Sequence, residues 1–143
     1  MSSYDEQNVF AKILRSEIPS YRVYEDENCL AFLDAFPVVM GHTILIPKTK
    51  CINILDTPED VASKVLSKLP IIAEAVKKAT GATGINIISN AGSDAGQAVF
   101  HTHFHIIPRF SEDNLLAFPK SIGMINSEEA NHIQELIKSN LNV

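Results

Sequence analysis

The sequence predicts an α+β domain, in which an antiparallel sheet of about five strands has helices packed on one side. Short segments that are apolar throughout, or that alternate in polarity, are typical of strands and occur in two groups along the chain. Segments with apolar residues at helical spacing precede, separate and follow these groups. A turn-rich segment between the last two expected strands favours a hairpin, and a hairpin requires antiparallel pairing.

The expected helices begin and break at recognisable residues. Residues 5–16 carry apolar side chains at helical spacing. Residues 58–79 follow Thr57, a good N-cap, and contain Pro70, which should kink or split the helix. Ser127, which acidic residues follow, is expected to cap a last helix that carries Ile133, Leu136 and Ile137.

The expected strands are short runs of apolar or alternating residues. They are residues 21–25, 29–34, 43–47, 85–89 and the run 99–109. Residues 90–97 are rich in glycine, asparagine and aspartate and should turn the chain between the last two strands. Residues 110–126 are expected to be irregular.

Composition limits the class of protein. The 143 residues suit one domain spanning residues 1–143, with its core over about 5–110 and a C-terminal extension over 111–143. A formal net charge of −5 argues against nucleic-acid polymers as partners. No apolar run approaches the length of about 18 residues that would span a membrane. Met1–Glu6 lack a signal-peptide pattern, and Cys29 and Cys51 form no disulfide framework, so we expect a cytoplasmic protein.

The most informative feature is a row of three histidines, His101, His103 and His105, at alternate positions in an apolar run. On a strand, every second side chain points to the same face, about 6–7 Å from its neighbour in the row. Imidazole titrates near neutral pH and can act as a base, acid, nucleophile or metal ligand. The spacing therefore predicts a reactive cluster on one face of a strand.

A three-histidine zinc site is the main alternative for this row. Ligands at both ends of the row, about 13 Å apart, cannot reach one ion unless the strand bends sharply. This geometry favours His103 as the reactive residue, with His101 and His105 supporting it. A histidine nucleophile suits phosphoryl chemistry, and the backbone N–H groups of Asn90–Gln97 could bind phosphate oxygens.

The stretch His-Thr-His-Phe-His-Ile-Ile resembles the H-φ-H-φ-H-φ-φ signature of the histidine triad superfamily of nucleotide hydrolases and transferases. Asp34, the segment Gly41–Lys48 and the segment Asn90–Arg109 occur in the order that this family shows. The Hint-like, or prokaryotic, branch is the most similar. The resemblance implies the fold of this family, a two-fold dimer and no cofactor.

The resemblance also implies a mechanism and a set of site residues. His103 would attack the α-phosphate of a nucleoside 5′-monophosphate derivative, a phosphoramidate or mixed anhydride, and water would then release the monophosphate from a nucleotidyl-histidine intermediate. His105 would orient His103 largely through its backbone carbonyl, and His101 and His42 would complete the cluster near the phosphate. The residues implied in substrate binding are Asp34 at the ribose, Val9, Phe10, Ile13 and Phe32 around a base that is expected to be a purine, and Asn90, Gly96, Gln97 and Ala98 at the phosphate and leaving group.

Other functions stay open at this point. Within the enzyme hypothesis, the nearest alternative is a dinucleoside polyphosphate hydrolase. Outside it, the alternatives are a nucleotide-binding regulatory module and the three-histidine metal site. Some prokaryotic members of the family bind structural zinc through an N-terminal C-x-x-C pair; here those positions are Asn8 and Ala11, so we expect no metal there.

Overall fold

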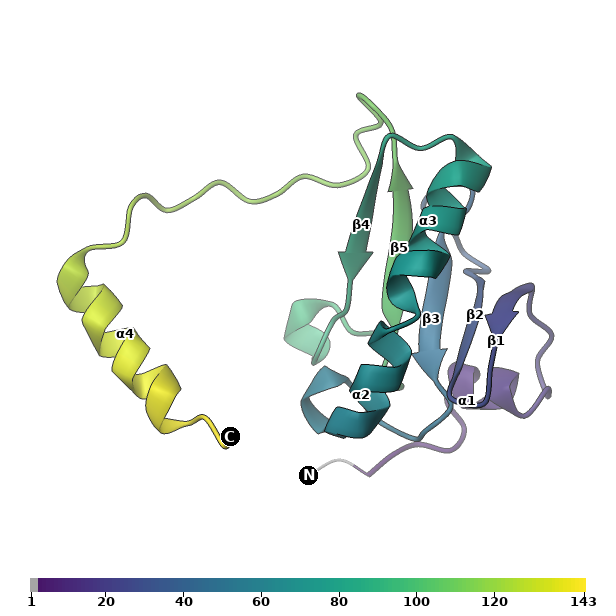
Figure 1. Ribbon diagram of the computed structural model, residues 1–143, viewed down its shortest axis with the longest axis horizontal. Helices are drawn as coiled ribbons and strands as arrows, with labels where there is room; N and C mark the ends of the chain where they lie inside the picture. Colours follow the sequence, from purple (N-terminus) through teal and green to yellow (C-terminus); the bar gives the residue numbers. More distant parts are fainter. Residues whose placement is uncertain (1–2) are drawn as a thin grey trace.

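The computed structural model describes residues 3–143 as an open sheet with helices on both faces and a C-terminal extension (Figure 1). The strands are β1 (Arg22–Glu25), β2 (Cys29–Leu33), β3 (Thr43–Pro47), β4 (Gly84–Ile88) and β5 (Phe104–Arg109). The helices are α1 (Val9–Leu14), α2 (Glu59–Leu66), α3 (Leu69–Thr80) and α4 (Ser127–Ser139), with short 3-10 turns η1 (Ile54–Asp56) and η2 (Ser93–Ala95). Residues 1 and 2, with which the expected domain begins, lie outside the described residues.

The sheet has the order β1-β2-β3-β5-β4, and every neighbouring pair of strands is antiparallel. The predicted α+β class with a five-stranded antiparallel sheet is therefore confirmed. The predicted hairpin is present as the pair β4 and β5, in which Ile87 faces Ile106. Strand β5 is an inner strand between β3 and β4, and the histidine segment lies where this strand begins.

Helices cover both faces of the sheet. The expectation that the helices lie on one side holds only for α2 and α3, because α1 packs on the other side. The strands β2 and β3 are apolar at almost every position because each of their faces packs against a helix. Cys29 and Ala31 face a core cluster shared with α2 and α3. Leu30 and Phe32 face a second cluster, which α1 completes from the opposite side.

The long helix expected over residues 58–79 is split into α2 and α3, as Pro70 indicated. The break falls at residues 67–68, just before the proline, which then occupies the first turn of α3, where its missing N–H needs no partner. Two caps are displaced by one residue from their predicted positions. Pro58 rather than Thr57 precedes α2, and Asn126 rather than Ser127 caps α4 through its side chain.

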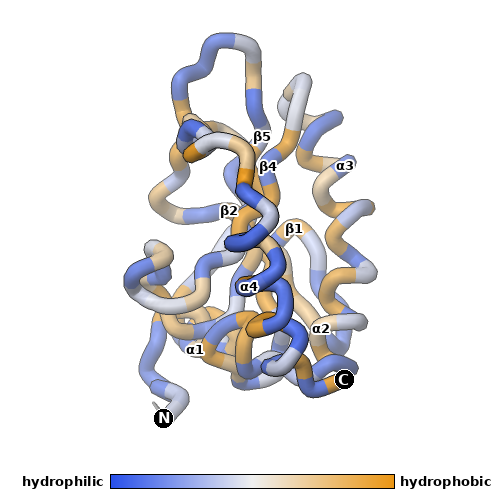
Figure 2. The backbone as a smooth tube through the Cα atoms, turned by 90° about the vertical axis from the view of Figure 1, so that its left-hand side faces the viewer, coloured by the Kyte–Doolittle hydropathy of each residue, from blue (hydrophilic) through white to orange (hydrophobic). Residues whose placement is uncertain are grey.

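The C-terminal extension leaves the sheet beyond β4 and carries α4 away from the rest of the chain (Figure 1). Figure 2 shows apolar and polar residues alternating along this helix. Its apolar side chains Ile133, Leu136 and Ile137 are 46–56% exposed. Within residues 3–143, no helix is long and apolar enough to cross a membrane.

Candidate active site

The histidine row does not lie on one strand throughout. Strand β5 begins at Phe104, so only His105 of the three histidines belongs to the sheet. Residues 101–103 precede the strand and do not pair with β3. The Thr102 N–H donates instead to the Cys51 carbonyl at 2.9 Å. The prediction that the three histidines share one strand is therefore wrong, although their rings still follow one another: the Phe10 ring meets both His101 and His103, and the His103 ring meets that of His105.

His103 is held by a backbone carbonyl. Its Nδ1 lies 2.6 Å from the carbonyl oxygen of His101, and only 5% of the residue is exposed. A carbonyl can only accept, so Nδ1 carries the proton and Nε2 carries the lone pair. The carbonyl that orients His103 belongs to His101, which corrects the expectation that His105 would supply it.

A second chain of hydrogen bonds runs from the backbone through His42 to His105. The Val38 N–H donates to His42 Nδ1 at 3.2 Å, so His42 carries its proton on Nε2. This Nε2 lies 2.9 Å from His105 Nδ1 and 3.5 Å from Asp34 Oδ2. When His42 donates to His105 Nδ1, the proton of His105 resides on Nε2.

The side chains of Asp34, His42 and His105 are of the kinds that bind metal ions. Within residues 3–143, the ligand atoms of Asp34, His42 and His105 all lie within 4.8 Å of one another. A metal on His42 Nε2 would move its proton to Nδ1, where it would face the Val38 N–H. Because two donors would then oppose each other, the arrangement fits a hydrogen-bond chain better than a metal centre.

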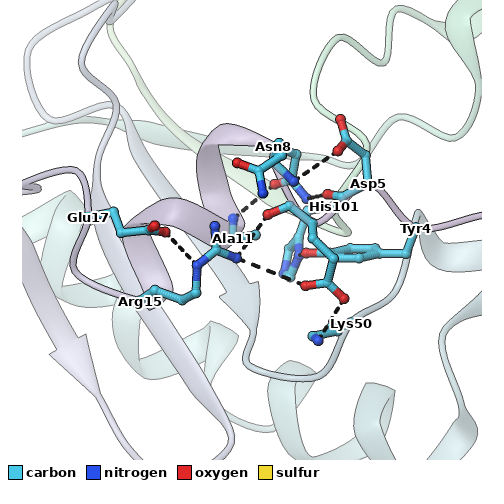
Figure 3. A network of polar contacts seen from close by, with 10 residues as sticks. Tyr4, Asp5, Asn8, Ala11, Arg15, Glu17, Lys50 and His101 are labelled. Atoms are coloured by element: carbon cyan, nitrogen blue, oxygen red, sulfur yellow. Dashed lines mark hydrogen bonds and ion pairs between the residues drawn. The ribbon is translucent and has the colours of Figure 1, made fainter.

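His101 is fixed outside the cavity that His103 lines. Its Nδ1 is 2.5 Å from the hydroxyl of Tyr4 (Figure 3). Its Nε2 is 2.9 Å from the carbonyl oxygen of Pro47, and its side chain does not line the cavity at His103. His101 was expected to complete the histidine cluster near the phosphate, and in the structure it stands beside His103 without lining this cavity.

Burial keeps the imidazoles of the site neutral. It lowers the pKa of His42, His101, His103 and His105 because the charged form is poorly solvated there. The neighbouring imidazole of His105 lowers the pKa of His103 further, while the His101 carbonyl offsets part of the decrease. Neutral His103 is the form that can act as a nucleophile near pH 7.

A cavity of about 540 Å³ opens beside these histidines. The predicted residues that line it are Val9, Phe10, Ile13, Phe32, Asp34, Gly96, Ala98, His103 and His105. The ring of Phe10 meets His103 edge-on with centroids 4.9 Å apart, and it meets Phe32 at 5.5 Å. The cavity therefore has an apolar part formed by α1 and β2, and a polar end with a carboxylate and two imidazoles.

Gln97 anchors the loop instead of lining the cavity. Its Oε1 accepts from the Gly92 N–H at 2.8 Å and from Asn53 Nδ2 at 3.2 Å. Its Nε2 donates to the carbonyls of Ile52 and Val99 at 2.7 and 3.1 Å. Both ends of the amide are thus occupied, and the predicted contact of Gln97 with phosphate is not available in this structure.

Other residues differ from the sequence prediction in smaller ways. Asn90 does not line the cavity, and its Nδ2 lies 3.5 Å from the Gly96 carbonyl. The lining residues that the sequence analysis did not include are Ile18, Pro19, Ser20, Tyr21, Leu33, Ala35, Phe36, Ile44 and Val99. No local sequence pattern identified residues 18–21 as cavity residues, because their position beside the cavity depends on where α1 packs.

Comparison with known proteins gives a consistent result. The model of the HIT domain family matches residues 15–112. Adenylylsulfatase HINT3 of Arabidopsis thaliana is 44% identical over 116 residues, which cover 81% of this chain and 59% of that protein. This chain thus spans less than two thirds of the length of HINT3.

Solved structures agree with this match. A HIT family protein of Bacillus anthracis str. 'Ames Ancestor' is 37% identical, with a TM-score of 0.90 over 98% of this chain and 100% of that chain. A histidine triad nucleotide-binding protein of Candida albicans is 28% identical, with a TM-score of 0.83 over 93% and 96% of the two chains. The fold is that of an α+β protein, and its cavity has His103 and His105 at the polar end. The chain belongs to the HIT domain family.

Proposed function

We propose that the protein is a nucleotidyl hydrolase that works through a nucleotidyl-histidine intermediate on His103. Membership of the HIT family supports a nucleotide-binding hydrolase in general, since relatives include an adenylylsulfatase and a nucleotide-binding protein. The observation that carries the proposal is the 2.6 Å bond from His103 Nδ1 to the His101 carbonyl, which leaves the Nε2 lone pair of a neutral imidazole as the nucleophile.

The cavity can hold a nucleoside monophosphate in one orientation. The base, which we take to be a purine, would pack between the apolar side chains of α1 and β2, including Phe10 and Phe32. Asp34 would accept hydrogen bonds from the ribose hydroxyls. The phosphate would then lie at the polar end, near His103 and the Gly96 backbone.

The reaction would proceed in two displacements at phosphorus. His103 Nε2 attacks the α-phosphorus, the bond to the leaving group breaks with its electron pair, and the positive imidazolium keeps its Nδ1 proton on the His101 carbonyl. Water then attacks the same phosphorus and loses a proton to the solvent, the N–P bond returns its electron pair to Nε2, and the nucleoside monophosphate leaves with His103 restored. Each step forms one bond to phosphorus and breaks one.

The leaving group needs a proton when it is an amine. Ala98, which lines the cavity, has no hydroxyl to donate. His105 lines the same cavity, and its Nδ1 is occupied by His42, so its Nε2–H can donate a hydrogen bond to the leaving group. Because loss of this proton would turn a neutral imidazole into an imidazolate, the proton that the amine takes up comes from water. We therefore take phosphoramidates and mixed anhydrides of nucleoside monophosphates as the substrate class.

Hydrolysis of adenosine 5′-monophosphoramidate tests the proposal. The wild-type protein should release AMP with or without EDTA, and His103→Ala should abolish this release. His132→Ala is the matched control, since His132 is exposed on α4, and it should keep full activity. Release that survives in His103→Ala, or that EDTA abolishes, would contradict the histidine-nucleophile mechanism and favour a metal centre.

We further propose that residues 5–110 form the folding unit and that two chains associate as a two-fold dimer on the side of β4. Strand β4 is an edge strand, and its Ile87 is 42% exposed. The helix α4 lies on the same side of the sheet (Figure 1).

The free cysteines Cys29 and Cys51 are both buried, which agrees with a reducing compartment such as the cytoplasm.

A further inference from the structure

The segment before α1 makes a contact that the proposed reaction does not use directly. The hydroxyl of Tyr4 lies 2.5 Å from His101 Nδ1, and the two rings meet edge-on with centroids 5.6 Å apart (Figure 3). On the other side of the imidazole, His101 Nε2 lies 2.9 Å from the Pro47 carbonyl. His101 is therefore clamped between the N-terminal segment and the end of β3.

The direction of each hydrogen bond follows from the partners. The Pro47 carbonyl can only accept, so His101 Nε2 carries the proton and Nδ1 carries the lone pair. The Tyr4 O–H must then donate to Nδ1. Burial raises the pKa of the Tyr4 phenol and lowers the pKa of His101, so the donor stays protonated and the acceptor stays neutral near pH 7.

Because both ring nitrogens of His101 are engaged, this histidine can serve neither as a nucleophile nor as a proton donor. Its contribution to the site is its backbone carbonyl, which accepts from His103 Nδ1 at 2.6 Å. A ring that is fixed at both nitrogens restrains the rotation of its own backbone, and therefore restrains the position of that carbonyl.

We propose that Tyr4 is a positioning residue for His103 and acts through His101. This inference rests on the proposed role of His103 as the nucleophile. Removal of the Tyr4 hydroxyl would free the His101 ring, loosen the carbonyl that fixes the His103 tautomer, and reduce the fraction of molecules in which Nε2 is the lone-pair atom.

The segment that carries Tyr4 is itself fastened to the fold. Glu6 Oε1 lies 2.7 Å from Lys50 Nζ, and the Glu6 carbonyl accepts from Arg15 Nη1 at 2.9 Å. The Asn8 side chain accepts from the Ala11 N–H and caps α1. These contacts hold the segment that follows Tyr4, so the tyrosine reaches His101 from a defined position.

The test compares Tyr4→Phe with Tyr24→Phe. Both substitutions remove only a hydroxyl, but the Tyr24 hydroxyl donates to Asp26 at 2.9 Å, and Tyr24 does not line the cavity at His103. Tyr4→Phe should lower kcat about tenfold, as expected when a hydrogen bond that orients a functional imidazole from outside the site is lost. KM should stay unchanged, because Tyr4 does not line this cavity. Tyr24→Phe should leave both constants unchanged.

Nitrogen NMR of the His103 ring supplies a readout that does not depend on turnover. The wild-type protein and Tyr24→Phe should show one tautomer with the proton on Nδ1, and Tyr4→Phe should show a mixture. A mixture seen in a protein that hydrolyses nothing would support the positioning role while the proposed function fails. An unchanged His103 tautomer in Tyr4→Phe, with kcat unchanged or with only a lower Tm, would overturn the inference.

Discussion

At the scale of single residues, the chemistry of the site is set by which nitrogen of each imidazole carries the proton. His103 and His101 are each fixed by a carbonyl acceptor, and His42 is fixed by a backbone N–H donor. Backbone groups cannot change their role as donor or acceptor. The tautomers are therefore built into the fold and do not have to be selected when a substrate binds.

The low pKa of His103 predicts how activity depends on pH. The nucleophile must be neutral, and burial disfavours its charged form, so protonation requires a pH below the ordinary histidine value of about 6.5. We expect kcat/KM to be constant at neutral pH and to decrease only as pH falls below that value. Rates measured from about pH 4.5 to 8, corrected for spontaneous hydrolysis, check this. An acid limb centred above pH 6.5 would contradict it.

Several residues of the site could be predicted from sequence because their roles follow from local spacing or from the family motif. Phe10, Ile13 and Asp34 line the cavity as expected. Tyr4 could not be predicted, since it meets a residue 97 positions away. Gln97 was assigned to phosphate because an amide suits that role, and only the folded loop shows that its amide is used within the protein.

At the scale of elements, the turn between β2 and β3 brings Asp34 and His42 together. The Asp34 N–H donates to the His42 carbonyl at 2.9 Å. Gly41 makes this turn possible with a φ of +92°, and a Cβ at this position would overlap Thr80 Cγ2 of α3. The turn thus needs glycine for both its backbone conformation and its close approach to a helix.

Substitution of this glycine should destabilise the fold. Gly41→Ala is expected to lower the free energy of unfolding by about 2 kcal/mol through backbone strain and steric overlap. Gly81→Ala is the matched control: Gly81 has a φ of +73°, and a Cβ added there would meet no atom of residues 3–143 within 4 Å, so this variant adds strain alone. Urea denaturation of the three proteins measures the difference. Equal losses in the two variants would show that the approach to Thr80 is unimportant.

The sequence predicted the order of elements well but not the side on which each helix packs. The uninterrupted apolar run Cys29–Leu33 was itself a signal of a strand buried on both faces, which requires a helix on each side. The short helix α1 supplies the second layer. The start of β5 was placed too early because the loss of pairing at Thr102 depends on Cys51, which lies in a separate segment.

At the scale of the whole molecule, the C-terminal extension carries its helix α4 away from the sheet (Figure 1). The match to the Bacillus anthracis structure covers 98% of this chain with a TM-score of 0.90, so the extension has a counterpart there. Arg109 fastens its beginning through Asp113 and the Leu116 carbonyl. Beyond that point, the apolar side chains of α4 are exposed, which favours their burial against a second copy.

The dimer proposal can be tested on α4. The full chain should sediment as a dimer, and Ile137→Lys should shift it toward monomer because it places a charge on the apolar face of the helix. Gln134→Lys adds the same charge to an exposed polar position of the helix and should leave the dimer intact. Sedimentation velocity from about 1 to 100 μM measures the populations. A full chain that is monomeric throughout this range would contradict the proposal.

The place of α4 could not be predicted, because a sequence reports which face of a helix is apolar but not which molecule covers it. Ile133, Leu136 and Ile137 indicated an amphipathic helix, and the structure confirms that helix while leaving its apolar face open.

Phe10, which belongs to a core cluster and also touches His103, limits how the site can change over evolutionary time. Truncation of a core phenylalanine costs about 3–5 kcal/mol, a large share of the stability of a small domain. A mutation that reshapes this part of the cavity for another base therefore endangers the fold. Tyr21 on the rim is 77% exposed, so changes there carry little such penalty. Nucleotide preference is expected to diverge among relatives through the rim at residues 18–21, while the floor of the cavity is inherited unchanged.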